Sequence, residues 1–246
     1  MNLLTYIRHL AVTGAASYYI STQIRDSKTR PSILASLQLS ESGSVPFLSL
    51  LGERAAREGD TWLAESLSKH ALDEARHSQI FAHALKRMNK QVVDNKLQLQ
   101  TTSTNKPKQQ RSPFFLAYFE GYSLEELKPT LINWDVFLGS TYILEFDSSK
   151  DYRRMAKVLP DNHLETRNLK KGLLSIAQDE ANHADYLYEA MMRRMPTNQV
   201  QNLVDEWRIR KVNAMFKIAN SVFEKTDETL LLVQDIERNK NNTTYS

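Results

Sequence analysis

The chain of 246 residues contains no cysteine and has only seven glycines and seven prolines. Without cysteine it cannot form disulfide bonds, thiolate zinc sites or cysteine-ligated iron–sulfur clusters. The absence fits a reducing compartment, so we expect a cytoplasmic protein. The scarcity of glycine and proline disfavours a turn-rich β fold and favours long, uninterrupted helices.

The sequence also lacks a strong excess of charge. Its formal net charge is +3, and it contains no compact block of lysine and arginine with interleaved aromatic residues. A balance this mild is typical of an ordinary solvated surface. We therefore expect no nucleic-acid partner.

The first twenty residues, MNLLTYIRHLAVTGAASYYI, are apolar but are interrupted by Arg8 and His9. The interruption makes them a poor transmembrane span, and they lack the order of basic, apolar and cleavage regions of a signal peptide. We expect residues 1–30 to form an amphipathic helical extension that packs on the rest of the chain. Peripheral contact of residues 1–20 with a membrane surface is the alternative.

Helical spacing of apolar residues predicts four long helices arranged as two hairpins. They span residues 31–58, 61–88, 131–158 and 164–195. The polar stretch 89–113 between the hairpins predicts a flexible crossover, and residues 196–246 predict a further helix to about Ile236 and a tail. The expected fold is all-α: a four-helix bundle of two hairpins over residues 31–195, with a long crossover and extra helices at both ends.

The motif Asp-Glu-x-x-His occurs twice, in LDEARHSQIF (72–81) and in QDEANHADYL (178–187). Residues three apart lie on one face of a helix, so Glu74 projects with His77 and Glu180 with His183. Di-iron and di-manganese bundles use one Glu-x-x-His from each of two helices. One copy alone is weak evidence, because charged helical surfaces produce it readily, but two copies at the middle of two helices indicate a metal site.

Such a site needs one inward glutamate from each of the other two helices, and Glu41 and Glu145 are the candidates. Glu41 lies 33 residues before Glu74, and Glu145 lies 35 residues before Glu180. These separations place each residue level with its partner in a helical hairpin. Glu145 stands in an apolar run, where an acid is costly unless it is paired or binds a metal. Asp147 is the rival ligand, but it faces the other side of its helix.

Each motif begins with an aspartate that is a candidate partner of a ligand imidazole. Asp73 and Asp179 each lie four residues before the histidine of their own motif. A carboxylate that accepts a hydrogen bond from a metal-binding histidine fixes its tautomer and raises its basicity. The spacing leaves open whether each aspartate serves its own helix or the opposite one.

Two features near the proposed site have open interpretations. Pro46 lies five residues after Glu41; either it kinks a continuous helix, or a helix begins near it and leaves Glu41 in a loop. His70 lies four residues before Glu74, and we expect it to pack near the site or to support a ligand.

The two motifs, together with Glu41 and Glu145, resemble the ferritin-like di-iron carboxylate superfamily over residues 31–195. The whole chain looks most like the ferritin-like domain proteins found in cyanobacteria, and no branch of the superfamily is assigned. The resemblance implies two metal ions bridged by Glu74 and Glu180. Six residues would be the ligands: Glu41, Glu74, His77, Glu145, Glu180 and His183.

The resemblance also implies a function. The leading expectation is a non-haem di-iron oxidoreductase that uses O₂ or peroxide, with an apolar small molecule as substrate and the aromatic segment SPFFLAYFEGY lining or gating its pocket. Manganese or a mixed centre could replace iron, and the partners would include an external electron donor and a second copy of the chain. The alternatives are an iron-handling ferroxidase or peroxide scavenger, and a non-catalytic scaffold.

Overall fold

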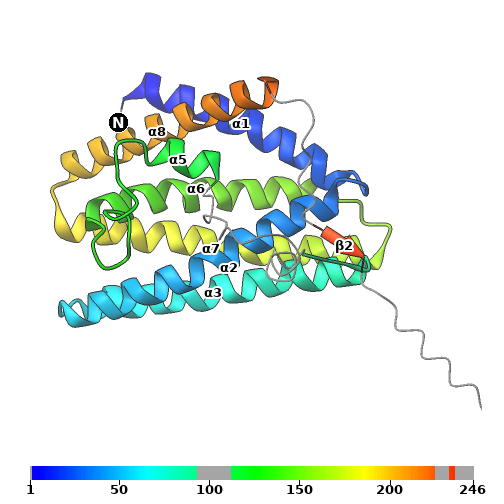
Figure 1. Ribbon diagram of the computed structural model, residues 1–246, viewed down its shortest axis with the longest axis horizontal. Helices are drawn as coiled ribbons and strands as arrows, with labels where there is room; N and C mark the ends of the chain where they lie inside the picture. Colours follow the sequence, from blue (N-terminus) through cyan, green and yellow to red (C-terminus); the bar gives the residue numbers. More distant parts are fainter. Residues whose placement is uncertain (1, 93–111, 225–232, 236–246) are drawn as a thin grey trace, which may run out of the picture.

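The computed structural model describes residues 2–92, 112–224 and 233–235. Seven helices account for most of these ranges (Figure 1). They are α1 (Leu3–Arg25), α2 (Arg30–Arg57), α3 (Thr61–Arg87), α5 (Pro113–Tyr118), α6 (Trp134–Val158), α7 (Leu164–Arg194) and α8 (Thr197–Glu224). The all-α fold class predicted from the sequence is confirmed, apart from one short pair of strands.

Helices α2 and α3 form the first hairpin, and local residue choice explains its ends. Pro31 stands in the first turn of α2, where no backbone N–H is needed. Gly59 has a φ of +85°, which closes the turn. Asp60 then caps α3 by accepting a hydrogen bond from the Leu63 backbone at 3.0 Å.

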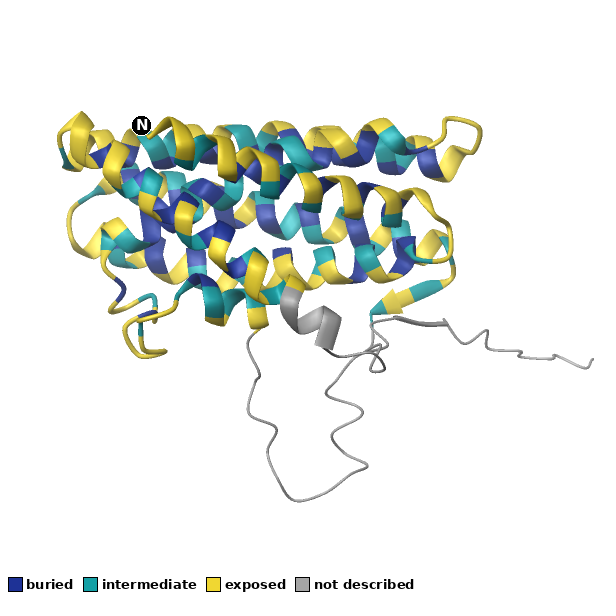
Figure 2. Ribbon diagram, turned by 90° about the horizontal axis from the view of Figure 1, so that it is seen from above, coloured by how far each residue is buried: buried dark blue, intermediate teal, exposed yellow. Residues whose placement is uncertain are grey.

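Helices α6 and α7 form the second hairpin in the same way. Asn133 caps α6 by accepting a hydrogen bond from the Asp135 backbone at 2.7 Å. Helix α7 ends at Arg194, two residues before Pro196, which cannot continue a helix that needs its N–H. Buried residues face the interior of this arrangement and exposed residues face outward (Figure 2).

Helices α1 and α8 lie side by side and cover α6 (Figure 1). At Gly139 of α6 the ring of Trp207 comes so close that an added Cβ would lie 2.5 Å from its Cδ1.

Asp147, the rival ligand, faces this layer and not the proposed site. It lies 2.9 Å from His9 Nε2 and accepts a hydrogen bond from Lys211 Nζ at 2.7 Å. Burial opposes its ionisation, but Lys211 and His9 outweigh burial and lower its pKa to about 2.

The two hairpins meet closely on one side only. On the α3–α7 side, a Cβ added at Gly172 would lie 2.7 Å from Ile80 Cγ2. On the opposite side, no Cα atom of α2 lies within 8 Å of a Cα atom of α6 in the described chain. The bundle is therefore closed along α3–α7 and open along α2–α6.

The predicted C-terminal helix is too long. Helix α8 ends at Glu224, and residues Val233–Asp235 form a strand, β2, that pairs antiparallel with β1 (Lys90–Val92). The pairing satisfies backbone groups of two segments far apart in the sequence, which helical periodicity cannot reveal. Strand β1 also begins the predicted crossover; residues 93–111 and the predicted tail after 235 lie outside the described residues.

The N-terminal segment forms a helix, α1, that packs on α6 and α8. Its buried face is mostly polar, with His9, Thr13, Ser17 and Ser21, whereas Leu3, Leu4, Ile7 and Leu10 are exposed. The helix therefore packs on the rest of the chain as predicted, but not through an apolar face. Among the helices of the described ranges, none combines the length and apolar character needed to cross a bilayer.

Candidate metal centre

Four helices bring the six predicted ligands together at mid-height of the bundle. Together with the side chain of His70, their side chains form two groups, and within each group the ligand atoms lie within 4.8 Å of one another. Apolar clusters lie on both sides of these groups along the bundle axis. The carboxylates and imidazoles are therefore held in a polar layer between two parts of the core.

The first group consists of Glu41, Glu74, His77 and Glu180, all buried. His77 directs Nδ1 to its centre. That nitrogen lies 3.2 Å from Glu180 Oε1, 3.6 Å from Glu74 Oε1 and 3.8 Å from Glu41 Oε2. One imidazole nitrogen thus faces three carboxylate oxygens from three helices.

The second group consists of His70, Glu74, Glu145 and His183. His183 also directs Nδ1 inward, 3.8 Å from Glu74 Oε1 and 3.8 Å from Glu145 Oε2. Glu74 belongs to both groups. Glu180 presents Oε1 to His77 and Oε2 to His183, the latter at 3.3 Å. Glu74 is thus a member of both groups, and Glu180 contacts a histidine of each.

The two aspartates support the histidines across the bundle. His77 Nε2 lies 3.3 Å from Asp179 Oδ2, and His183 Nε2 lies 3.3 Å from Asp73 Oδ2. Each aspartate therefore serves the histidine of the opposite hairpin, which decides between the two routes that the spacing left open. Arg76 contacts both Asp179 and Asp73. These contacts between aspartates and histidines of opposite hairpins join α3 to α7 directly behind the imidazoles of His77 and His183.

Glu41 lies in a continuous helix, because α2 runs through Pro46 without a break. The alternative that placed Glu41 in a loop is wrong. Its Oε1 accepts a hydrogen bond from the buried Tyr152 hydroxyl, and Ser44 Oγ lies 2.9 Å from Glu74 Oε2. These contacts orient two of the carboxylates from the α2–α6 side.

His70 belongs to the second group, although the sequence did not predict it as a ligand. Its Nε2 lies 3.3 Å from Glu74 Oε1 and 3.5 Å from Glu145 Oε1. Its Nδ1 lies 2.8 Å from the Tyr186 hydroxyl, and its ring stacks on that of His183 at 3.7 Å. The spacing His70-x₃-Glu74-x₂-His77 puts all three residues on one helical face, which was the available signal.

Burial and crowding perturb the acids strongly. Burial raises the pKa of Glu41 and Glu180 well above the ordinary range, and neighbouring carboxylates add to the effect. Burial also opposes ionisation of Glu74, but the adjacent imidazoles of His70 and His77 outweigh burial and hold its pKa well below the usual value. Buried charges of one sign are costly unless cations balance them.

The histidines supply part of that balance. Burial would lower the pKa of His77, but the carboxylates of Glu180, Glu41 and Glu74 outweigh burial and raise it to about 12. The imidazole proton thus neutralises some of the buried negative charge. Metal binding requires this proton to leave, because only a deprotonated imidazole nitrogen is a ligand.

The donor atoms fit a metal ion. His77 Nδ1 and His70 Nε2 are buried and have no hydrogen-bond partner within the described part of the chain. The other nitrogen of each ring is already in contact with a neighbour: His77 Nε2 faces Asp179, and His70 Nδ1 faces Tyr186. Carboxylate and imidazole donors suit iron and manganese. These buried glutamate and histidine groups could therefore hold a metal ion.

A cavity of about 780 Å³ reaches the metal centre from the open α2–α6 side. Five residues of the two groups line it: Glu41, His70, Glu74, Glu145 and Glu180. Its remaining walls are mainly apolar and include Phe47, Phe115, Tyr118, Ile132, Phe137 and Leu144. The aromatic segment at α5 lines this cavity, as expected; its gating role stays a prediction.

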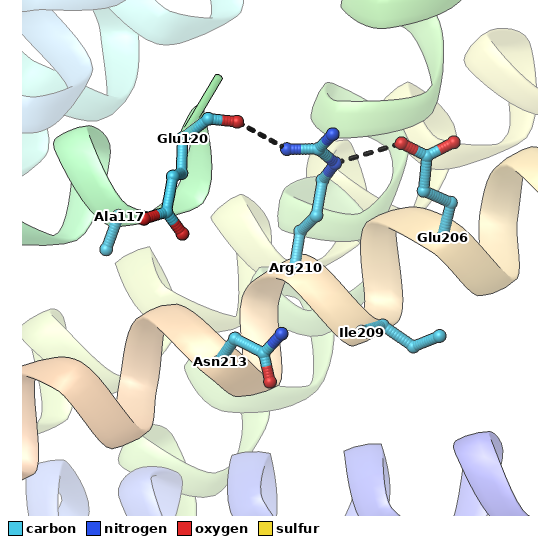
Figure 3. Close-up of a pocket in the computed structure, with 6 residues that line it drawn as sticks. All are labelled: Ala117, Glu120, Glu206, Ile209, Arg210 and Asn213. Carbon is cyan, nitrogen blue, oxygen red and sulfur yellow. Dashed lines mark hydrogen bonds and ion pairs between the residues drawn. The ribbon is translucent and has the colours of Figure 1, made fainter. Parts of the chain in front are cut away.

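A second hollow, of about 390 Å³, lies on the outer surface of α8 (Figure 3). Arg210 dominates it and donates to the Glu120 backbone carbonyl and to Glu206 Oε1, both at 2.9 Å. The guanidinium is therefore already used to join the segment after α5 to α8. We assign this hollow no ligand.

Comparisons of the chain with protein-family models, with curated proteins and with solved structures gave no significant match. The functional argument consequently depends on the geometry of the metal centre and of the cavity beside it.

Proposed function

We propose that this chain is a ferritin-like di-iron carboxylate protein and acts as a non-haem oxidoreductase that uses O₂ or peroxide to oxidise an apolar small molecule. The observation that carries the proposal is the pair of ligand groups sharing Glu74 beside a largely apolar cavity. A paired site of this composition is typical of di-iron and di-manganese carboxylate bundles.

In this proposal each group holds one metal ion. Glu74 and Glu180 would be shared by the two ions, Glu41 and Glu145 would each hold one ion, and each ion would receive at least one imidazole. When bound, two reduced iron ions supply the electrons that activate O₂ or peroxide. An external electron donor is required for each further turnover.

The residues behind the ligands prepare them for this role. A proton on His77 Nε2 is donated to Asp179, which leaves the lone pair of Nδ1 directed at the group. Asp73 does the same for His183. The apolar walls of the cavity exclude water from the reacting centre and protect it from side reactions.

Anaerobic titration with ferrous iron, followed by O₂ or peroxide, tests the proposal. We expect about two iron ions per chain, and O₂ consumption that continues only when a reductant and an apolar substrate are both present. Glu180→Gln should reduce both the number of bound iron ions and the rate of O₂ consumption. A parallel titration with manganese decides which metal is preferred, because the ligands accept either.

Two results would replace this function by another. Repeated turnover of ferrous iron or peroxide without an organic substrate would indicate an iron-handling protein. Failure to bind iron or manganese at all would leave a non-catalytic scaffold. The cavity favours the oxidoreductase, since the other two functions have no need of an apolar chamber next to the ligands.

A further inference from the structure

We propose that the outward face of α1 is the interface through which two copies of this chain form a symmetric dimer. Six exposed residues on one side of the helix define this outward stripe: Leu4, Arg8, Ala11, Ala15, Tyr18 and Thr22. The inference does not depend on the metal centre or on the proposed function.

The outer side of α1 is more apolar than the side that packs on the chain. Leu3 and Leu4 are 66% and 59% exposed, and Tyr18 and Tyr19 are 74% and 63% exposed. At about 200 Å² for a whole aromatic side chain, the two tyrosines alone leave on the order of 250 Å² open. Monomers rarely leave a continuous apolar surface larger than a few hundred Å² unless a partner covers it. The outer side of α1 therefore has the character of an interaction surface.

Polar contacts hold α1 with this side outward. The Asn2 backbone N–H donates to Asp205 Oδ2 at 2.7 Å, and His9 Nε2 lies 2.9 Å from Asp147 Oδ2. Lys211 Nζ donates to the same buried carboxylate at 2.7 Å. Turning the helix over would separate His9 from Asp147 and would place apolar side chains against buried charges, which is costly. The apolar side is therefore fixed toward the exterior.

The spacing of the outward stripe is that of a helix that packs against another helix. Its residues follow one another at alternating steps of four and three, as in the seam of a coiled coil. Small side chains stand at its centre, where Ala11 and Ala15 flank Gly14, and an added Cβ at Gly14 would meet no atom within 4 Å. Small residues at a contact let two helices approach closely. A second helix therefore fits the middle of the stripe.

The outward stripe is also symmetric about position 13. Its residues form three pairs at equal distances from that position: Ala11 with Ala15, Arg8 with Tyr18, and Leu4 with Thr22. In a two-fold interface, each residue contacts its counterpart on the partner, and that counterpart makes the same contact in return. Two antiparallel copies of α1 that meet at position 13 satisfy this condition along the whole stripe.

Charge favours the antiparallel arrangement. Helix α1 contains no acidic residue, so Arg8 cannot be neutralised by another copy of the helix. In a parallel pair the two Arg8 side chains would face each other. In the antiparallel pair each guanidinium faces the ring of the partner's Tyr18, a favourable cation–π geometry. The two arginines are then ten positions apart along the pair, about 15 Å, which exceeds the distance over which physiological salt screens charges.

A bilayer surface fits the same face less well. Helices that lie on membranes insert large apolar side chains along the middle of their apolar face. The middle of the outward stripe carries Ala11 and Ala15, and the larger side chains stand toward its two ends. A second copy of the chain is therefore the partner that the shape of this face selects.

Sedimentation analysis of the full chain across a micromolar concentration series tests the dimer. We expect the wild type to dimerise and Ala15→Trp, which places a large ring at the centre of the stripe, to be monomeric. Ala56→Trp introduces the same ring at an exposed position of α2 and should leave the dimer intact. A wild-type chain that is monomeric throughout, or a dimer retained by folded Ala15→Trp, would overturn the proposal.

A rescue experiment tests the antiparallel register. Tyr18→Lys places a positive charge opposite the partner's Arg8 and should raise the dimer Kd at least about tenfold. Adding Arg8→Glu to Tyr18→Lys should restore most of the affinity, because each new glutamate then faces a lysine of the partner. The two positions are about 15 Å apart within one helix, so they cannot pair internally. A folded double variant that dimerises no better than Tyr18→Lys would contradict this register.

Vesicles of phosphatidylcholine and phosphatidylserine separate the dimer from a membrane role. We expect the wild type to remain in solution as a dimer when the vesicles are sedimented. Cosedimentation of a monomeric chain, reduced by Leu4→Gln, would assign the face to a bilayer and overturn the proposal.

Discussion

The α3–α7 side and the α2–α6 side of the bundle are built from the same two hairpins but pack in opposite ways. On the first, Gly172 meets Ile80 and the aspartates exchange contacts with histidines of the opposite helix. On the second, the helices stand apart and enclose a cavity. The difference teaches that a closed side fixes the ligands, while an open side leaves their inner atoms accessible to a small molecule.

The largest effect is expected from His70, which touches both the metal centre and the cavity. Loss of a residue behind a ligand costs about 10–100-fold in metal affinity, so loss of a ligand should cost more than about 100-fold. His70→Ala should therefore reduce the metal content from about two ions per chain to about one, as measured by elemental analysis.

Two controls sharpen this result. Tyr186→Phe removes only the contact at Nδ1 of His70, and His83→Ala removes an exposed histidine of the same helix. Tyr186→Phe should keep more metal than His70→Ala, because the ligand imidazole stays, and His83→Ala should retain the full metal content. An unchanged metal content in His70→Ala would show that this histidine only packs behind the centre.

A smaller loss is expected when the closed side is weakened at Asp179. Asp179→Asn removes the carboxylate that faces His77 Nε2 and Arg76, so the imidazole loses its fixed orientation. Metal affinity should fall by about 10–100-fold, measured by competition with a chelator of known affinity. Asp73→Asn should act in the same way through His183, while Asp185→Asn, an exposed aspartate of α7, should have no effect. Equal affinity in all three variants would contradict the cross-bundle contacts.

The smallest effects compare one glycine from each side. Gly172→Ala should destabilise the fold by about 1 kcal/mol, because overpacking against Ile80 exceeds the gain in helix propensity. Gly43→Ala, where an added Cβ meets nothing within 4 Å, should stabilise it by up to about 1 kcal/mol. Denaturant unfolding of the two variants measures both changes. Shifts of the same sign would contradict the assignment of a closed and an open side.

Helical geometry explains why most of the centre could be predicted from the sequence. Glu74 and His77 must share a face because they are three residues apart, and the same holds for Glu180 and His183. A hairpin of known length then places Glu41 and Glu145 level with them. These constraints act within one helix or one hairpin, and the printed sequence contains all of the information they require.

The features that could not be predicted depend on contacts between hairpins. The role of His70 depends on Glu145 and His183, which belong to the other hairpin. The cross-bundle partners of Asp73 and Asp179 depend on how α3 packs against α7. The cavity depends on the separation of α2 from α6, and the end of α8 at Glu224 precedes a strand that pairs with a distant one. No local pattern carries these long-range relations.

The central claim is that the two Asp-Glu-x-x-His motifs form one paired metal centre, and the metal content of the purified chain tests it most directly. Protein from iron-supplemented and manganese-supplemented cultures should carry about two ions per chain, and His77→Ala and His183→Ala should each lose about one of them while remaining folded. Wild-type protein that carries neither metal under both conditions would contradict the claim.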